Sequence, residues 1–341
     1  MTLSTTLITI LSITSCCDSL STVSLEVSLD FNSSVRTIHV IDADTIVFSG
    51  SGGLVGVTTN GGKNWETTTV EVDGVTPSFR ACAASDGFLH ITSIESPALI
   101  LKTSINHLSE FDVKFRDDNP TMFLDAMAFN NNGWGVVMGD PTDGCLTILI
   151  SSDDGESWHR IPCNVIPEMK EGESAFAASN GNISVFEDQI WIATGGKSSR
   201  VFHSEYLGNE WKVYDTPLIQ GGNMTGAFAI TFRSEHEGLI IGGDWENKAN
   251  NTGNIAHTTD GGKSWTLCSE GEGPGYRSSI IWRPGYPTHC LAIGSEGISM
   301  SIDSGVTWNE ISEHGFYTGR FTPDGKTLWL AGIGVISKMN F

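Results

Sequence analysis

A short turn motif that repeats along the chain constrains the fold more than any other feature. Its best copy runs from Thr258 to Trp265 and has the form Ser/Thr-x-Asp-x-Gly-x-Ser/Thr-Trp. The Asp side chain and the hydroxyls can accept hydrogen bonds from backbone N–H groups of their own turn. Gly suits a positive φ, and Trp brings a large apolar surface to the returning strand. The motif therefore predicts a tight β-hairpin. One acid per turn supplies too few oxygen ligands for Ca²⁺, so we assign these residues a structural role.

The motif recurs at a regular spacing. Three further copies span 58–65, 151–158 and 301–308, and eroded copies span 104–111 and 204–211. The aromatic residues that close the six copies are 43 to 54 residues apart. Several short strands within such a period are typical of a β-propeller. The residues that define the complete copies are Asn60, Trp65, Asp153, Trp158, Asp260, Trp265, Asp303 and Trp308.

Each repeat divides into four strands, which in the first repeat cover 35–40, 45–49, 54–58 and 65–70. The first strands of later repeats are expected to start at 79, 124, 173, 224, 276 and 319, which makes seven repeats. The seventh has only three strands. Residues 22–30 alternate apolar and polar side chains, so they predict a strand that completes this repeat and closes the ring. We expect one all-β, seven-bladed propeller domain over 22–341. Six blades are the alternative if the second repeat is irregular.

The composition narrows the range of partners. The net charge is −21, which argues against binding nucleic acid through bulk electrostatics. No stretch approaches the roughly 18 apolar residues of a membrane span. We expect a monomer, with a protein or a carboxylate-bearing or glycan ligand as its partner. No cofactor motif is present, and no C-x-x-C or spaced His pair indicates a metal site.

The first 17 residues have the character of an export leader, because they are apolar and rich in Ser and Thr. A signal peptide is one interpretation. A lipoprotein leader with a lipid anchor on Cys16 is the other. Sequons at Asn32, Asn182, Asn223 and Asn250 support export in a eukaryotic host. The expected location is secreted or extracytoplasmic.

Two cysteines flank the third copy of the motif symmetrically. Cys145 and Cys163 are equidistant from Asp154, the centre of that turn. Antiparallel pairing would place them opposite one another, within disulfide range. We predict this disulfide for an oxidising compartment. Two buried free thiols are the alternative.

The repeated motifs resemble the Asp-box (BNR) repeats of sialidase-like propellers. The chain from about residue 30 also resembles the photosystem II stability/assembly factor propellers. That likeness rests on the runs 138–141 (MGDP), 173–180 (ESAFAASN), 194–197 (TGGK), 242–245 (GGDW) and 273–277 (GPGYR). The resemblance implies a propeller with protein partners. The oxidoreductase label sometimes given to this wider group finds no support, because no nucleotide-binding glycine motif or C-x-x-C is present.

Charged residues recur at the predicted starts of the innermost strands, which crowd one mouth of the central channel. Arg36, Arg80, Arg277 and Arg320 recur at equivalent points, and arginine binds carboxylates bidentately. Asp140, Asp244 and Trp245 follow nearby strands. Two explanations are open: a ligand or partner site, or a polar plug in which the arginines pair with acids such as Asp125 and Glu173.

An enzyme is the alternative function. A sialidase-like glycosidase would need an arginine cluster, a Tyr nucleophile (Tyr276 or Tyr317), Glu173 to activate it and Asp125 as the acid. The Arg-Ile-Pro element of sialidases is missing, and seven repeats exceed their six. We therefore favour an exported, non-catalytic binding or assembly scaffold that uses the arginine-lined mouth.

Overall fold

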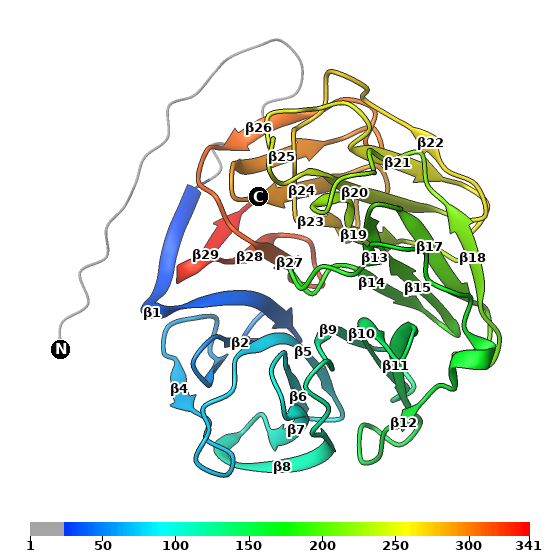
Figure 1. The fold of residues 1–341 in the computed structure, drawn as a ribbon. Coiled ribbons are helices and arrows are strands. Elements are labelled where there is room, and N and C mark those ends of the chain that lie inside the picture. The colour runs from blue at the N-terminus through cyan, green and yellow to red at the C-terminus, as the bar shows by residue number, and fades with distance from the viewer. Residues whose placement is uncertain (1–23) are drawn as a thin grey trace.

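The computed structural model describes residues 24–341, which form strands and one short 3₁₀ helix, η1 (Cys163–Val165). The leader, Cys16 and the first two residues of the predicted N-terminal strand lie outside the described residues. The sheets stand around a common centre like the blades of a ring (Figure 1). The all-β propeller predicted from the repeats is confirmed.

Antiparallel strands form four-stranded blades, in which the first strand is innermost and the fourth is outermost. Blade 1 consists of the second half of β1 (Ser24–Val40), β2 (Thr45–Gly50), β3 (Leu54–Thr59) and β4 (Glu66–Thr69). Blade 2 consists of β5 (Phe79–Ser85), β6 (Phe88–Ser93), β7 (Ala98–Ser104) and β8 (His107–Asp117). Blade 3 consists of β9 (Leu124–Phe129), β10 (Gly135–Thr142), β11 (Cys145–Ser151) and β12 (His159–Arg160).

Four further blades complete the ring. Blade 4 consists of β14 (Ile183–Phe186), β15 (Gln189–Ala193), β17 (Arg200–Ser204) and β18 (Lys212–Asp215). Blade 5 consists of β19 (Thr225–Phe232), β20 (Gly238–Asp244), β21 (Ile255–Thr258) and β22 (Thr266–Leu267). Blade 6 consists of β23 (Ser279–Trp282), β24 (Cys290–Gly294), β25 (Gly297–Ser301) and β26 (Asn309–Ser312). Blade 7 consists of β27 (Thr318–Phe321), β28 (Thr327–Ala331), β29 (Ile333–Asn340) and the first half of β1.

One long strand joins the two ends of the ring. The first half of β1 pairs with β29, and its second half pairs with β2. The register shifts between Asp30 and Ser34, where the strand passes from one blade to the next. The predicted N-terminal strand and the first strand of blade 1 are therefore one continuous element. This pairing agrees with a seven-bladed ring, and it covers edges that would otherwise be exposed.

The predicted start of blade 4 was wrong. Its innermost strand is β14 rather than a strand from Glu173. Glu173 lies in the two-residue strand β13 (Glu173–Ser174), which pairs with β16 (Gly195–Gly196). The eight residues between β13 and β14 leave the ladder, because their backbone groups find partners in the centre of the ring.

The hairpin motifs make their hydrogen bonds within each turn. Asp260 Oδ1 accepts from Thr258 Oγ1 (2.8 Å) and from the Ser264 N–H (2.9 Å), while Thr258 Oγ1 accepts from the Gly262 N–H (3.0 Å). The Trp265 indole N–H donates to the Gly262 carbonyl (3.0 Å). The two bonds to the Asp or Asn oxygen recur in the copies at Asn60, Asp153 and Asp303, whereas the indole bond recurs only at Trp308 among these three copies. The Asp and Ser or Thr side chains of the motif therefore make their hydrogen bonds within the turn, which supports a structural role.

The turns also join neighbouring blades. Gly62 has a φ of +79°, and a Cβ there would lie 2.5 Å from the ring of Trp329 in blade 7. Gly155 of blade 3 lies just as closely on His90 of blade 2. The Trp191 indole of blade 4 donates to the Gly261 carbonyl of blade 5 (2.8 Å). Each motif therefore closes its own hairpin and also packs against the preceding blade.

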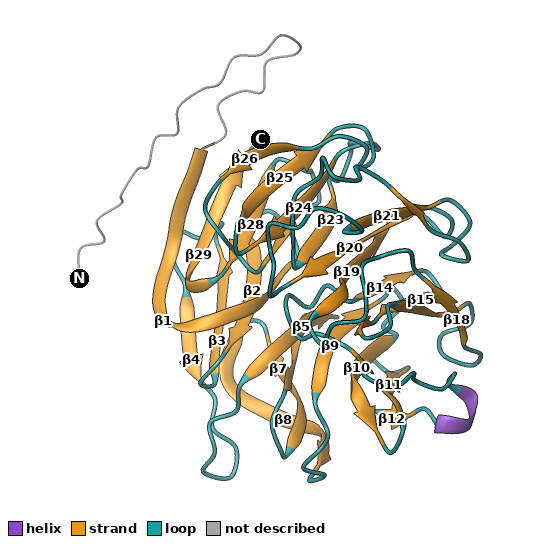
Figure 2. Cartoon of the chain, turned by 45° about the horizontal axis from the view of Figure 1, so that its top comes forward, coloured by secondary structure: helices purple, strands orange, loops and turns teal. Residues whose placement is uncertain are grey.

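The disulfide Cys145–Cys163 is present, with 5.6 Å between the Cα atoms. The two residues are not cross-strand partners, however. Arg160 pairs with Leu149, and this register continued along β11 would place residue 164 opposite Cys145. The short β12 ends before Pro162, and Cys163 reaches its partner from η1, which Figure 2 shows at the outer edge of the ring.

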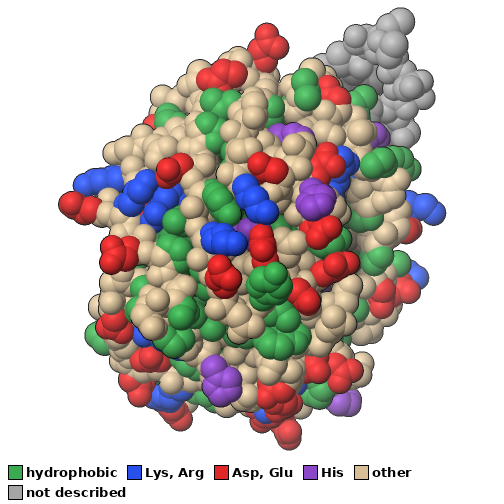
Figure 3. All heavy atoms as spheres, turned by 90° about the vertical axis from the view of Figure 1, so that its right-hand side faces the viewer, with side chains coloured by type: hydrophobic (Ala, Val, Ile, Leu, Met, Phe, Trp, Pro, Cys, Tyr) green, Lys and Arg blue, Asp and Glu red, His purple; other side chains and the backbone are tan. Residues whose placement is uncertain are grey.

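The core lies between the faces of adjacent sheets. Buried clusters combine side chains of neighbouring blades, as where Phe48 of blade 1 packs with Trp329 of blade 7. The side of the ring in Figure 3 carries many Asp and Glu side chains with Lys and Arg among them, as expected from the net charge of −21. Among residues 24–341, no helix has the length and apolar character needed to cross a membrane.

The hairpin motif yields a stability prediction with a control built into the chain. Asp260→Ala removes the acceptor for Thr258 and Ser264 and leaves their donors without a partner, which should cost about 1–3 kcal/mol of unfolding free energy. Asp260→Asn should cost clearly less, because Asn60 makes the equivalent two bonds in blade 1. Urea denaturation of the three proteins measures both. Equal losses of unfolding free energy in the Ala and Asn variants would contradict the role of Oδ1 as the acceptor in this turn.

Candidate functional site

The centre of the ring is occupied by residues 175–182, which we call the channel segment. It connects β13 to β14, and in Figure 1 the green loop of the fourth blade extends into the middle of the ring. Its sequence, Ala-Phe-Ala-Ala-Ser-Asn-Gly-Asn, consists mainly of small residues. A backbone buried in this way must find hydrogen-bond partners for its polar groups.

Four consecutive carbonyls of the channel segment each receive a side-chain donor from another blade. The donors come from blades 1, 2 and 7: Arg80 Nη1 to Ala177 O (3.4 Å), Arg36 Nη1 to Ala178 O (3.5 Å), Thr318 Oγ1 to Ser179 O (2.9 Å) and Arg320 Nη2 to Asn180 O (3.1 Å). Three of the four predicted arginines therefore converge on one short peptide. Hydrogen bonds from charged donors are the stronger kind.

Asn180 extends the network to the opposite blades. Its Nδ2 donates to the Cys82 carbonyl (3.0 Å), and its Oδ1 accepts from the Met127 N–H (2.7 Å). Its φ of 54° is a left-handed conformation that Asn tolerates better than most residues. The Ile230 N–H of blade 5 donates to the Gly181 carbonyl (2.7 Å). The channel segment thus contacts inner strands all around the ring.

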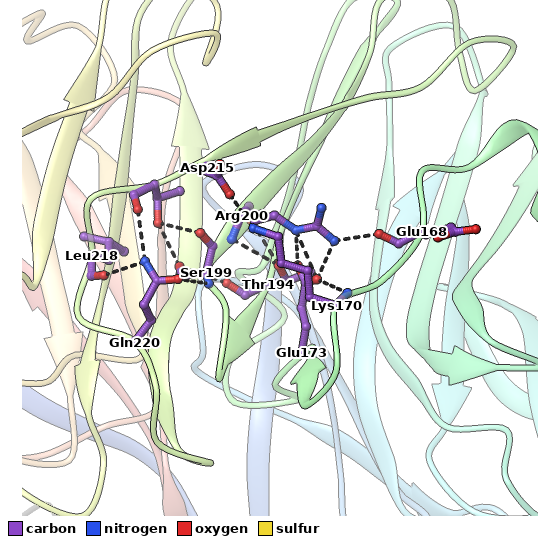
Figure 4. Close-up of polar contacts among 10 residues, drawn as sticks. Glu168, Lys170, Glu173, Thr194, Ser199, Arg200, Asp215, Leu218 and Gln220 are labelled. Atoms are coloured by element: carbon purple, nitrogen blue, oxygen red, sulfur yellow. Dashed lines mark hydrogen bonds and ion pairs between the residues drawn. The ribbon is translucent and has the colours of Figure 1, made fainter.

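A buried ion pair anchors the start of the channel segment (Figure 4). Arg200 Nε lies 3.0 Å and 3.1 Å from the two carboxylate oxygens of Glu173, and the side chains are 7% and 0% exposed. The Thr194 hydroxyl and the Lys170 N–H also donate to this carboxylate. Glu173 therefore has no acceptor capacity left for catalysis, and its role is to hold the entry of the channel segment.

The fourth predicted arginine is oriented differently. Arg277 is buried in blade 6, where it donates to the Tyr276 carbonyl (3.0 Å) and to Ser299 Oγ (3.4 Å). Arg36 stacks on the ring of Tyr317, with its guanidinium carbon 3.9 Å from the ring centre. The structure thus brings Arg36, Arg80 and Arg320 together and leaves Arg277 within its own blade.

These arginines share one electrostatic property. Most lysines and arginines of the chain lie within 4 Å of a carboxylate. In residues 24–341, five arginines do not: Arg36, Arg80, Arg277, Arg283 and Arg320. Three of them, Arg36, Arg80 and Arg320, surround the channel segment. Their carbonyl partners carry no charge, so the positive charge of the mouth stays uncompensated at short range.

Two predicted acids of the mouth, Asp125 and Asp140, form no ion pair among the described residues. Asp125 is 0% exposed, and neither of its oxygens has a well-formed hydrogen bond among the described residues. Burial, and then the nearby Asp140, raises the pKa of Asp125 well above its usual value. Burial also raises the pKa of Asp140, whose Oδ1 accepts from the Ala175 N–H (3.1 Å). Arg80 opposes the rise at Asp125 without reaching ion-pair distance.

Aromatic residues complete the mouth. Phe176 of the channel segment stacks on Phe228 (4.1 Å between ring centres), and Tyr276 meets Phe228 edge-on (4.8 Å). Tyr276 is 4% exposed, and burial raises its pKa above the usual value for a phenol. Trp245 is 47% exposed beside Asp244, whose carboxylate accepts from the backbone of residues 246 and 247.

Three of the four candidate catalytic residues are buried, and Arg36 stacks on the fourth, Tyr317. The carboxylate of Glu173 is fully engaged by Arg200, the hydroxyl of Tyr276 is buried, and Asp125 is enclosed. Burial lowers the pKa of His39 and of His203 to about 4, so both are neutral structural residues at pH 7. Within the described part of the chain, no three His, Cys, Asp or Glu residues cluster as a metal site would require.

The channel segment was not recognised from the sequence. Its run of small residues is the one signal that could have indicated it, because only small side chains let a backbone pass between seven converging strands. Phe176 within the segment and Thr318, which donates to it, carry no distinguishing pattern.

The buried carboxyl of Asp125 yields a pH prediction. Its folded-state pKa is raised, so its contribution to stability is complete below about pH 3.9 and is lost as the pH rises through the folded value. Asp125→Asn keeps the shape without the charge. At pH 7 the unfolding free energy of this variant should exceed that of the wild type by about 1 kcal/mol or more. The difference should vanish near pH 4. Urea denaturation at both pH values measures this. An equal or lower stability of the variant at pH 7 would show that Arg80 compensates the charge.

No family model and no curated protein matches the chain by sequence. Solved structures match it over nearly its whole length. YCF48 bound to D1 peptide has a TM-score of 0.68 at 16% identity, over 95% of this chain and 98% of that chain. YCF48 from Cyanidioschyzon merolae has a TM-score of 0.65 at 13% identity, over 91% of this chain and 96% of that chain. YCF48 is a photosystem II assembly factor, so the predicted likeness to that group of propellers is confirmed in the fold.

Proposed function

We propose that this chain is a non-catalytic scaffold that binds a protein partner through the arginine-lined mouth. The partner would present a carboxylate, either a side chain or a chain end. Arg36 and Arg80 are half-buried at the mouth, and they use one Nη each on neutral carbonyls of the channel segment. Their remaining donors can form charge-assisted bonds with a carboxylate.

The single observation that carries the proposal is the uncompensated charge. In a chain with 40 acids and 19 bases, three arginines gather around one peptide without a carboxylate within 4 Å among the described residues. A carboxylate that enters this partly desolvated site exchanges its hydrogen bonds with water for charge-assisted bonds to the guanidinium groups, which are stronger where the local dielectric is low. Trp245, exposed beside the mouth, adds an apolar contact of the kind found at protein interfaces.

The comparison supports the kind of partner. YCF48, which has this fold, is bound to D1 peptide in one of the similar structures. By analogy with that peptide complex, we infer that a peptide of an assembling protein complex binds to this protein, and we place it at the mouth on the strength of the arginines there. We also propose that the protein works outside the cytoplasm, since the disulfide Cys145–Cys163 requires an oxidising compartment. A signal peptide or a lipid anchor at Cys16 would take it there.

The experiment compares affinity capture of partners from extracts of the host by three proteins. Arg36→Lys combined with Arg80→Lys keeps the charge but removes the bidentate fork. Arg116→Lys combined with Arg160→Lys makes the same change in two arginines that pair with Asp73 and Asp143 elsewhere. We expect the mouth variant to capture at least about tenfold less of the partner than the wild type. The control variant should capture as much as the wild type.

Thermal melts show whether each variant is folded. Capture of the same partners by a folded mouth variant and by the wild type would overturn the proposal. Hydrolysis of a fluorogenic sialoside by the wild type would instead establish the enzyme.

A further inference from the structure

A second arginine site lies on the other face of the ring. Because strands alternate in direction, the hairpin motifs and the turns from first to second strands share one face, and the mouth lies on the opposite face. Arg283 follows β23 in such a turn. It is one of the five arginines without a carboxylate within 4 Å among residues 24–341, and it is only 9% exposed. Burying a guanidinium without a counter-charge costs folding free energy, and a bound anionic ligand would offset that cost.

Arg283 lines a groove of about 430 Å³. Its guanidinium carbon lies 3.9 Å from the ring centre of Tyr286 and 4.8 Å from that of Phe341. Its Nε donates to the Gly325 carbonyl of blade 7 (2.9 Å). No acceptor in the described chain receives its two Nη groups. The stacked rings and the one hydrogen bond hold this fork in place, so it is preorganised for a ligand.

The rest of the groove is mostly apolar. Its walls are formed by residues of blades 5 and 6: Arg233, Trp282, Pro284, Gly285, Tyr286 and Pro287. Arg233 stacks on the ring of Trp282, 4.6 Å from its centre. Unlike Arg283, it is already paired, with Glu237. The groove thus combines one free guanidinium with two aromatic rings, of which Tyr286 is 41% exposed.

We propose that this groove binds an extended peptide segment in which a carboxylate adjoins proline or other apolar residues. Proline-rich segments dock into aromatic-lined grooves, because their extended conformation costs little entropy on binding. Arg283 selects the carboxylate bidentately and thereby sets the register of the peptide. Charge complementarity favours this occupant over a basic or neutral one. The site is separate from the mouth and does not depend on the proposed function.

The main competing explanation is purely structural. Arg283 joins the turn of blade 6 to blade 7 through Gly325 and Phe341, which explains its Nε and its stacking. That role does not use the Nη groups and does not require an apolar groove in front of them. A ligand readout therefore separates the two explanations.

The test uses fluorescence anisotropy of the full chain with a labelled ten-residue peptide of alternating Glu and Pro. A matched peptide has Gln in place of each Glu. We expect the Glu peptide to bind at least about tenfold more tightly than the Gln peptide. Arg283→Gln and Tyr286→Ala should each abolish most of this difference. Arg160→Gln, which removes an arginine paired with Asp143 elsewhere, should not.

Each other outcome overturns the proposal. Equal binding of the two peptides, or no binding at millimolar protein, excludes a carboxylate site. If Arg283→Gln fails to fold, Tyr286→Ala decides, because Tyr286 is 41% exposed and its removal disturbs the core less. Binding that is lost in the Arg36→Lys, Arg80→Lys variant but kept in Tyr286→Ala assigns the peptide to the mouth instead, and leaves the proposed function standing.

Discussion

Hydrogen bonds from arginines to the carbonyls of the channel segment are the interactions on which the centre of this propeller depends. Seven innermost strands converge there, and a backbone placed among them must have every carbonyl satisfied. The four carbonyls from Ala177 to Asn180 receive donors from several blades, so that Arg36, Arg80 and Arg320 each join their own blade to the same peptide. Asn180 does the same for blades 2 and 3. The blades are thus joined at the centre as well as at the rim.

The same bonds explain why the mouth is suited to a partner. Carbonyl acceptors orient a guanidinium without cancelling its charge. The buried acids nearby do not cancel it either, because burial favours the neutral form of Asp125. Of the two explanations considered for the arginines, the structure shows the plug, and the partner site remains our proposal. They do form a polar plug, but its partners are backbone carbonyls rather than acids, and the charge remains available. The second proposed site has the same feature, because two aromatic rings and one carbonyl orient Arg283 without cancelling its charge.

The repeated hairpin motif made most of the fold predictable, because each copy uses its side chains within its own turn. Strands of blade 1 lie within a residue or two of their predicted bounds, except that β1 unites two predicted strands. The pairing of Cys145 with Cys163 followed from their symmetry about the turn, although Pro162 ends β12 and changes the register. Local patterns of this kind are visible in a sequence.

Interactions between distant blades are not visible in the same way. The path of the channel segment is decided by donors that lie far from it in the chain, such as Arg320, and so the start of blade 4 was misplaced at Glu173. Equivalent positions in the repeats did indicate that arginines gather at the mouth. They could not show that Arg277 bonds within its own blade, because that depends on Ser299 and on burial. Arg283 lies in the turn after β23, away from the starts of the innermost strands at which the repeat pattern indicated arginines.

Hydrogen exchange at the Met127 amide tests the position of the channel segment most directly. This amide donates to Asn180 Oδ1, across the channel. Asn180→Gly keeps the left-handed backbone conformation but removes this acceptor. We predict strong protection of Met127 in the wild type and its specific loss in Asn180→Gly, while the neighbouring amides of β9 that pair with β10 stay protected. Rapid exchange of Met127 already in the wild type, or protection that survives the substitution, would show that the segment does not occupy the channel.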